Sequence, residues 1–197
     1  MLTQDFARGS LRVVDYETAE PPQTDDLAKL SAPLNSTLTG ELDGAQWYLG
    51  VAIEEILLAA LGLTIARTIG EGVVPVDVAG HSGSVPLRCT SAGFATATES
   101  LAAVHRTLAA GPGPPKLAAK TPAEIFFSYL GTQPGVRHAL ELRAYRTADL
   151  VQLDWWYDTR SFHRSTVEEL AEQLPLALIE LTSEAMPPVD APMAVGH

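Results

Sequence analysis

The stretch that decides the fold runs from Glu124 to Arg160 and reads EIFFSYLGTQPGVRHALELRAYRTADLVQLDWWYDTR. It holds three runs typical of strands, Ile125–Leu130, Ala139–Arg146 and Leu150–Tyr157. The second run alternates between apolar and polar residues, which is the period of a half-buried strand. The polar break between the last two runs is short, so we predict that they form an antiparallel hairpin.

Helical periodicity is strong on both sides of these strands. Apolar residues recur at three-four spacing through Ala45–Ile69, which is typical of one long helix or of two helices, the first ending near Gly50. Thr96–Ala109 and Ser165–Ser183 are the other predicted helices. The last begins with a Ser-x-x-Glu capping box, and Pro175 inside it predicts a kink or a break.

Further strands are predicted before and after the first helix. Leu34–Leu42 and Val73–Ala79 alternate, and Val85–Arg88 is typical of a short strand. Pro75 indicates that its strand lies at an edge, or that this residue is at the strand's start. Together these patterns predict an α/β two-layer sandwich, in which helices cover a mixed, mostly antiparallel sheet.

Length and composition limit the class of protein. The 197 residues suit one domain, predicted over residues 1–185, with a disordered tail at 186–197. A formal net charge of −11, with 13 Lys+Arg, argues against a nucleic-acid partner. The lone Cys89 excludes an intrachain disulfide, and no metal-ligand spacing occurs. The first residues lack an apolar signal segment and Ile56–Ala66 is too short to span a bilayer, so we expect a cytoplasmic protein without membrane contact.

The order of the motifs resembles a known family. FFSYLG, then HALELRAYRTADLVQLDWWYDTRSF, then a final amphipathic helix, is similar to the closing part of condensation and epimerization domains of nonribosomal peptide synthetases. That family's first strand usually reads Phe-Asn-Tyr-Leu-Gly, and Ser128 stands at the Asn position. ILLAALGLTIARTIGEG and VPVDVAGHSGS resemble a helix and a strand of the second lobe. The resemblance implies a chloramphenicol acetyltransferase-like lobe, one of two that enclose a tunnel.

The chain also departs from that family. The catalytic motif His-His-x-x-x-Asp-Gly belongs to the first lobe, and it does not occur here. The segments that normally cross to the other lobe are short, both between GHSGS and Val85 and before the FFSYLG strand. The resemblance therefore implies a free-standing, trimmed C-terminal lobe that lacks the family's general base.

Five residues are candidates for a site. His81 lies in the turn GHSGS, a near miss for a nucleophile elbow, and is either an exposed turn residue or a base near a tunnel mouth. By the resemblance Ser128 or Tyr129 would line the tunnel, while the alternative is that Tyr129 packs in the core. Alternation sends Trp155 and Trp156 to opposite faces, for core packing or for binding a substrate or partner.

Two classes of function follow from the resemblance. The first is a non-catalytic interaction module that binds a carrier protein, a synthetase component or a complementary lobe. The second is an acyl or peptidyl transferase whose active site is completed by a dimer or a partner chain. It would use His81 or His138 as base and a phosphopantetheine-bound substrate on a carrier protein, without a cofactor of its own. A small-molecule binding protein is a third interpretation. We expect a homodimer or a heteromer, because Phe94, Phe162 and the two tryptophans need cover.

Overall fold

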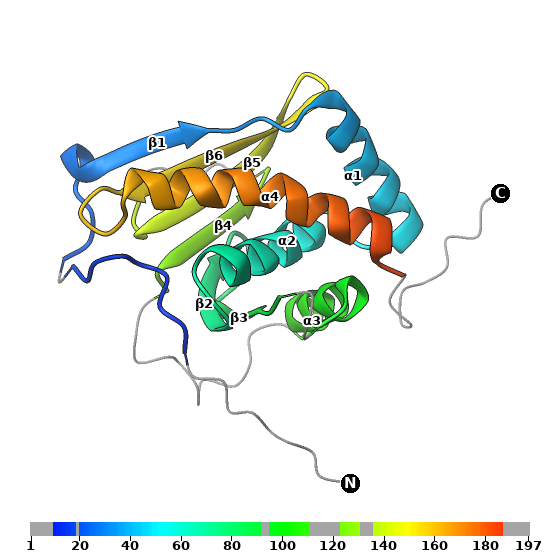
Figure 1. Ribbon diagram of the computed structural model, residues 1–197, viewed down its shortest axis with the longest axis horizontal. Helices are drawn as coiled ribbons and strands as arrows, with labels where there is room; N and C mark the ends of the chain where they lie inside the picture. The colour runs from blue at the N-terminus through cyan, green and yellow to red at the C-terminus, as the bar shows by residue number, and fades with distance from the viewer. Residues whose placement is uncertain (1–9, 19, 92–94, 111–122, 131–135, 187–197) are drawn as a thin grey trace, which may run out of the picture.

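The computed structural model describes residues 10–18, 20–91, 95–110, 123–130 and 136–186 (Figure 1). The predicted tail beyond Met186 lies outside these residues. After a short 3-10 helix at Thr24–Asp26, the elements in chain order are β1 (Leu27–Ser31), α1 (Ser36–Leu49), α2 (Ile53–Thr68), β2 (Gly72–Val78), β3 (Ser84–Cys89), α3 (Ala97–Ala109), β4 (Ile125–Tyr129), β5 (Leu140–Thr147), β6 (Leu150–Asp158) and α4 (Arg164–Glu184).

The described strands form one six-stranded sheet in the order β1-β6-β5-β4-β2-β3. β4 is parallel to both of its neighbours, β2 and β5, and the other three pairings are antiparallel. The predicted hairpin is confirmed, because β5 and β6 pair out to Thr147 and Leu150 at the turn. The mixed, mostly antiparallel α/β fold predicted from the sequence is therefore confirmed.

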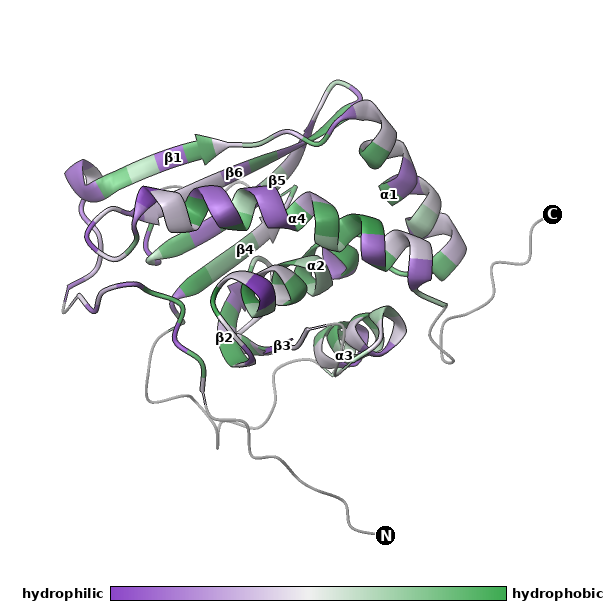
Figure 2. Cartoon of the chain, viewed as in Figure 1, coloured by the Kyte–Doolittle hydropathy of each residue, from purple (hydrophilic) through white to green (hydrophobic). Residues whose placement is uncertain are grey.

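The helices lie over one face of the sheet (Figure 1). α2 is central: it packs against α4, β3 and β4, and it is buried on nearly every side, as expected of a helix that is apolar all round. β2 and β4 are coloured largely as hydrophobic, and α4 is mixed at both ends and mostly hydrophobic in its middle (Figure 2). The core thus fills the space between helices and sheet, and no described helix covers the opposite face. No single described helix is both long and apolar enough to cross a membrane.

The segment Leu34–Leu42, predicted to be a strand, is instead largely the first part of α1. Asn35 is the N-cap, and its side-chain oxygen accepts a hydrogen bond from the N–H of Leu38 at 2.8 Å. The leucines of this segment fit the helical spacing as well as the strand period, so the pattern was ambiguous. Gly50 ends α1 with a φ of 67°, which makes the two-helix interpretation of Ala45–Ile69 the correct one.

The predictions at the helix cap and the prolines also need correction. α4 begins after His163, and the predicted cap Ser165 lies inside the helix. The helix continues through Pro175, so the predicted break is absent, because buried leucines on both sides hold it against the core. Pro75 lies in β2, an interior strand, where the prediction placed it at an edge or a strand start. It is tolerated because β4 pairs with β2 only from Val76 onward, so no donor is needed at Pro75.

Candidate functional site

The face of the sheet without helices carries a row of charged and aromatic side chains. The strand register places Asp77, Phe126, Glu141, Trp156 and Lys29 directly beside one another, one from each of β2, β4, β5, β6 and β1. Alternation along each strand turns all five to the side opposite the core. This surface, with the polar residues that neighbour the row, is called the open face below.

Three carboxylates of the open face are buried. The exposed fractions of Glu141, Asp154 and Asp158 are 2%, 5% and 0%. A carboxylate taken out of water without compensation is strongly unfavourable, so each must be neutralised and hydrogen-bonded. Asp158 meets this requirement with Arg160, whose backbone N–H and Nη2 each donate at 2.9 Å.

Asp154 lies in the next row, between β1 and β5. It accepts hydrogen bonds from Ser31 Oγ at 2.7 Å and from the Tyr145 hydroxyl at 2.9 Å, and it forms an ion pair with Lys29 Nζ at 2.7 Å. Burial alone would raise the pKa of Asp154, but the bonds from Lys29, Ser31 and Tyr145 outweigh it and lower the pKa below its ordinary value. This carboxylate therefore stays ionised and ties three strands together.

Glu141 is the centre of the network. Arg143 donates to its Oε2 from Nε at 3.0 Å and from Nη2 at 2.5 Å. The backbone N–H of Arg137 donates to Oε1 at 2.7 Å, and the N–H of His138 at 3.3 Å. Burial would raise the pKa of Glu141, but the bonds from His138, Arg137 and Arg143 lower it below its ordinary value. These bonds hold the Glu141 carboxylate in place as an anion, so it is not available as a general acid or base.

His138 stands between two carboxylates. Its Nδ1 lies 3.3 Å from Glu141 Oε1 and its Nε2 lies 2.9 Å from Asp77 Oδ2. The ring stacks on Phe126, with centroids 5.4 Å apart and planes at 23°. Burial alone would lower the pKa of His138, but its hydrogen bonds to Glu141 and Asp77 raise it overall. An imidazolium that donates from both nitrogens has no lone pair with which to accept a proton.

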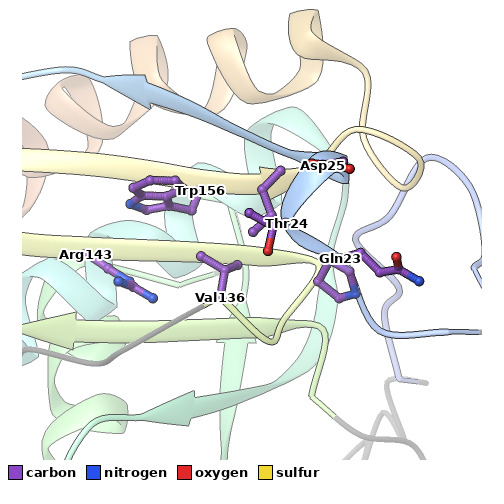
Figure 3. A pocket seen from close by; sticks show the side chains of 8 residues that line it. Gln23, Thr24, Asp25, Val136, Arg143 and Trp156 are labelled. Atoms are coloured by element: carbon purple, nitrogen blue, oxygen red, sulfur yellow. The ribbon is translucent and has the colours of Figure 1, made fainter.

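A hollow of about 630 Å³ opens on this face (Figure 3). Its floor includes Trp156 and Arg143, and its rim includes Val136 and the turn around Thr24. Lys29 Nζ and Arg143 Cζ lie 5.5 Å and 5.9 Å from the centroid of the indole, at cation–π distance. A second hollow of about 280 Å³ borders His138, and Pro22 lines both. The two hollows therefore adjoin along the edge of the open face.

The two candidate residues on β4 face opposite sides of the sheet. Ser128 is fully buried on the side of the open face and pairs in register with Arg143. Its hydroxyl has no hydrogen-bond partner among the described residues. Tyr129 faces the core, and its hydroxyl accepts a hydrogen bond from Arg146 Nε at 3.3 Å. Ser128 thus lies close to the open-face network, whereas Tyr129 belongs to the packing.

The tryptophans lie on opposite faces, as the alternation predicts. Trp155 is fully buried in the core and Trp156 is half-buried on the open face. Phe162 is also buried by the chain itself, with 2% of its surface exposed. Trp155 and Phe162 therefore need no partner to cover them, which corrects that part of the argument for an oligomer. Phe94 lies outside the described residues.

His81 lies away from the open-face row, in the turn between β2 and β3. Its Nδ1 is 3.5 Å from the carbonyl oxygen of Ala79, and Gly80 and Gly83 adopt φ values of 81° and 85° that the tight turn requires. A strand follows the turn, so it is not a nucleophile elbow. Burial raises the pKa of Glu54 nearby, and the charge of His81 opposes this shift.

Sequence reasoning missed most of the open-face network. Glu141, Arg143 and Asp154 were visible only as the polar positions of two alternating strands. The position of His138 depends on residues from β2, β4 and β5, so only the register of the sheet could have shown it. Among the described residues, no group of three or more His, Cys, Asp or Glu side chains is placed to hold a metal ion.

Solved structures share this architecture. The epimerization domain from the third module of tyrocidine synthetase B superposes with a TM-score of 0.71 at 16% identity, over 90% of this chain and 52% of that one. The X-domain from teicoplanin biosynthesis gives 0.68 at 14%, with the same shares of 90% and 52%. The chain has the fold of one half of a condensation or epimerization domain. A condensation domain of the enacyloxin polyketide synthase matches at 0.60 and 14% identity, over 90% of this chain and 44% of that one.

Sequence relatives lie in polyketide synthases. A phenolphthiocerol/phthiocerol polyketide synthase subunit from Mycobacterium tuberculosis, and its counterpart from Mycobacterium bovis, are each 36% identical over 226 residues, which cover 86% of this chain. The chain spans 15% of the length of these curated relatives. Because the alignment is longer than the 197 residues of the chain, the relatives carry extra residues within the matched region. No family model matches the chain.

Proposed function

We propose that this chain is a non-catalytic interaction module of a polyketide or nonribosomal peptide assembly line. Its open face would bind a carrier protein, a synthetase component or a complementary lobe. The observation that carries the proposal is the bonding of His138, whose two ring nitrogens both face carboxylates. A surface with fixed ion pairs and an occupied histidine suits recognition, because its side chains need little ordering when a partner binds.

The relatives support an assembly-line role. The sequence relatives are polyketide synthase subunits, and the structural neighbours include condensation and epimerization domains. The teicoplanin X-domain has also been solved in a complex with OxyB, and that structure superposes with a TM-score of 0.65. A domain of this fold can therefore serve as a binding surface for a partner. For this chain the partner would be a component of its own synthase.

The alternative is a transferase whose active site a partner completes. It would need a base with a free lone pair, and His138 would have to leave Glu141 or Asp77 to provide one. We expect no peptide-bond formation, esterification or epimerization when the purified chain is mixed with loaded carrier proteins. Turnover that disappears in a His138→Ala or His81→Ala variant would favour the transferase instead.

Binding can be tested on purified components. The probes are purified carrier domains, loaded and unloaded, and other components of polyketide and nonribosomal peptide synthases, with affinity measured by biolayer interferometry. Trp156→Ala removes the aromatic floor of the larger hollow and should weaken binding at least tenfold. Trp47→Ala is the matched control, because Trp47 is 74% exposed on α1, on the helical side.

The outcomes separate cleanly. Loss of affinity in Trp156→Ala alone supports docking on the open face. Equal affinity in both variants and the wild type would show that the partner binds outside the open face. No binding by any component at about 100 µM would contradict the interaction module itself, since even weak transient complexes form in that range.

A further inference from the structure

The sheet ends in two edge strands, β3 and β1, and the two edges differ. An edge strand presents a row of backbone N–H and C=O groups that can pair with another chain. Proteins usually block such edges with proline, charged side chains or covering elements. Whether an edge is blocked therefore indicates whether it can serve as a pairing surface.

The β3 edge is blocked by its own sequence. Pro86 lies directly opposite Pro75 of β2, and two prolines cannot exchange ladder hydrogen bonds, so this is a non-hydrogen-bonded pair. The backbone nitrogen of Pro86 therefore points outward, at the middle of the edge, where it offers no donor. Arg88 adds a charge two residues on, and α3 packs against the strand.

The β1 edge has no proline and keeps backbone donors and acceptors on its outward side. The N–H of Ala32 donates to Leu153 and that of Thr159 to the carbonyl of Asp26, so the even-numbered residues of this segment face β6. In an antiparallel ladder the alternate residues must then face outward. These are Leu27, Lys29 and Ser31. The N–H of Leu27 already donates to the carbonyl of Thr24, so the outward donors are the N–H groups of Lys29 and Ser31. No described element lies beyond β1, which forms the margin of the fold (Figure 1).

A lysine on an edge strand usually opposes pairing with another chain by its charge, but the ammonium group of Lys29 does not lie at the edge. Its ammonium forms an ion pair with Asp154 at 2.7 Å and lies 5.5 Å from the Trp156 ring centroid, over the open face. The side chain therefore follows the surface of the sheet inward, away from the edge. The centre of the β1 edge therefore has no charged group, among the described residues, that would oppose pairing with another strand.

We infer that β1 pairs antiparallel with β1 of a second copy of this chain, which joins the two sheets into one. A two-fold axis at Lys29 places Leu27 opposite Ser31 of the second copy. The N–H groups of Lys29 and Ser31 in each chain then donate to the carbonyls of Lys29 and Leu27 in the other. On the helical side Ala28 then meets Leu30 of the second copy in the closer, non-hydrogen-bonded pairs. Both residues are only partly buried within one chain, so the pairing also covers apolar surface.

The paired surface is short, so the association is weak. Five residues of strand bury less than a standard interface, and we expect a dissociation constant on the order of 10–100 µM. Sedimentation equilibrium from about 5 to 500 µM should show the mass rising from one to two chains. Over the same range, hydrogen exchange at the amides of Lys29 and Ser31 should slow, while the amide of Leu27, which is bonded to Thr24, does not change.

Two substitutions at Lys29 distinguish the effect of its backbone N–H on association from the effect of its side chain. Lys29→Pro removes the central outward donor and should lower the association constant at least tenfold. Lys29→Ala loses the same contacts with Asp154 and Trp156 but keeps the donor, so it should still dimerise. If Lys29→Pro fails to fold by circular dichroism, the exchange experiment on the wild type still decides.

Two results would overturn the inference. One is a wild type that stays monomeric at 500 µM, and the other is equal association by the Pro and Ala variants. The inference does not rest on the proposed docking function. A monomer that still binds synthase components would remove the strand pairing alone, and a dimer that binds none of them would remove the docking function alone.

Discussion

Gly62 is the position where one added methyl group should do the most damage. It lies in α2 where the helix meets the edge strand β3. A Cβ built on Gly62 would be 2.8 Å from the carbonyl oxygen of Arg88 and 3.4 Å from Cδ1 of Leu87. The closer atom belongs to the backbone, so it cannot rotate away as the end of a side chain could. Gly62→Ala must therefore move α2 away from the strand.

The size of the effect follows from two opposing terms. Replacing glycine by alanine within a helix stabilises by roughly 0.5–1 kcal/mol, because less conformational freedom is lost on folding. Overpacking a filled core costs about 1–3 kcal/mol. The steric term is larger, and we expect Gly62→Ala to lower the free energy of unfolding by about 1–2 kcal/mol. For a chain of this length that is a fall in Tm of roughly 2–8 °C.

Urea unfolding of matched variants measures the effect. Gly44→Ala is the control, because Gly44 is exposed on α1 and a Cβ there would have no neighbour within 4 Å. It should raise stability by about 0.5–1 kcal/mol, so the two alanines should have opposite signs. The argument fails if Gly62→Ala is neutral or stabilising. That result would mean that α2 and β3 are not in the close contact described.

Two further predictions concern the open face and the hairpin. His138→Gln should destabilise most between about pH 5 and 6.5, because the raised pKa of His138 contributes stability below its unfolded value that is lost as pH rises through the folded pKa. The pKa of Glu141 is lowered, so the stability that its carboxylate contributes is lost at acid pH, as pH falls through the folded pKa. A difference in unfolding free energy between mutant and wild type that does not depend on pH would contradict both assignments. Ala148→Gly should stabilise by about 0.5–1 kcal/mol. A φ of 52° strains alanine by roughly 1–2 kcal/mol, and relief of this strain is partly offset because glycine has more conformational entropy in the unfolded state. Asp149→Gly, at a residue without positive φ, should destabilise instead, and equal signs in thermal melts would rule out the strain.

The sequence predicted the fold well where one pattern had one structural meaning. β5 and β6 alternate over a short hairpin, and a strand is the structure that matches this period. The segment from Leu34 fits a strand and a helix equally, and the decisive signal was the cap at Asn35, not the leucines. Pro175 was given too much weight, since local propensity yields when a helix is held by a buried face on both sides.

The site was harder to predict because it depends on register. Trp156 could be assigned to the face opposite Trp155 from alternation alone, and this assignment is confirmed. Glu141 lies directly between Trp156 and Phe126, and this follows only from how the three strands β4, β5 and β6 align. His138 lies in none of these strands, so no periodicity could place it between two carboxylates.

The composition of the open face is consistent with the role in recognition that we propose. Buried ion pairs add little net stability compared with apolar packing, so the carboxylates of Glu141 and Asp154 are not explained by folding alone. The ion pairs of these carboxylates with Lys29 and Arg143 give the face a defined pattern of charge around Trp156. A partner with the complementary pattern would find these side chains already in place, and like-charged surfaces would be rejected.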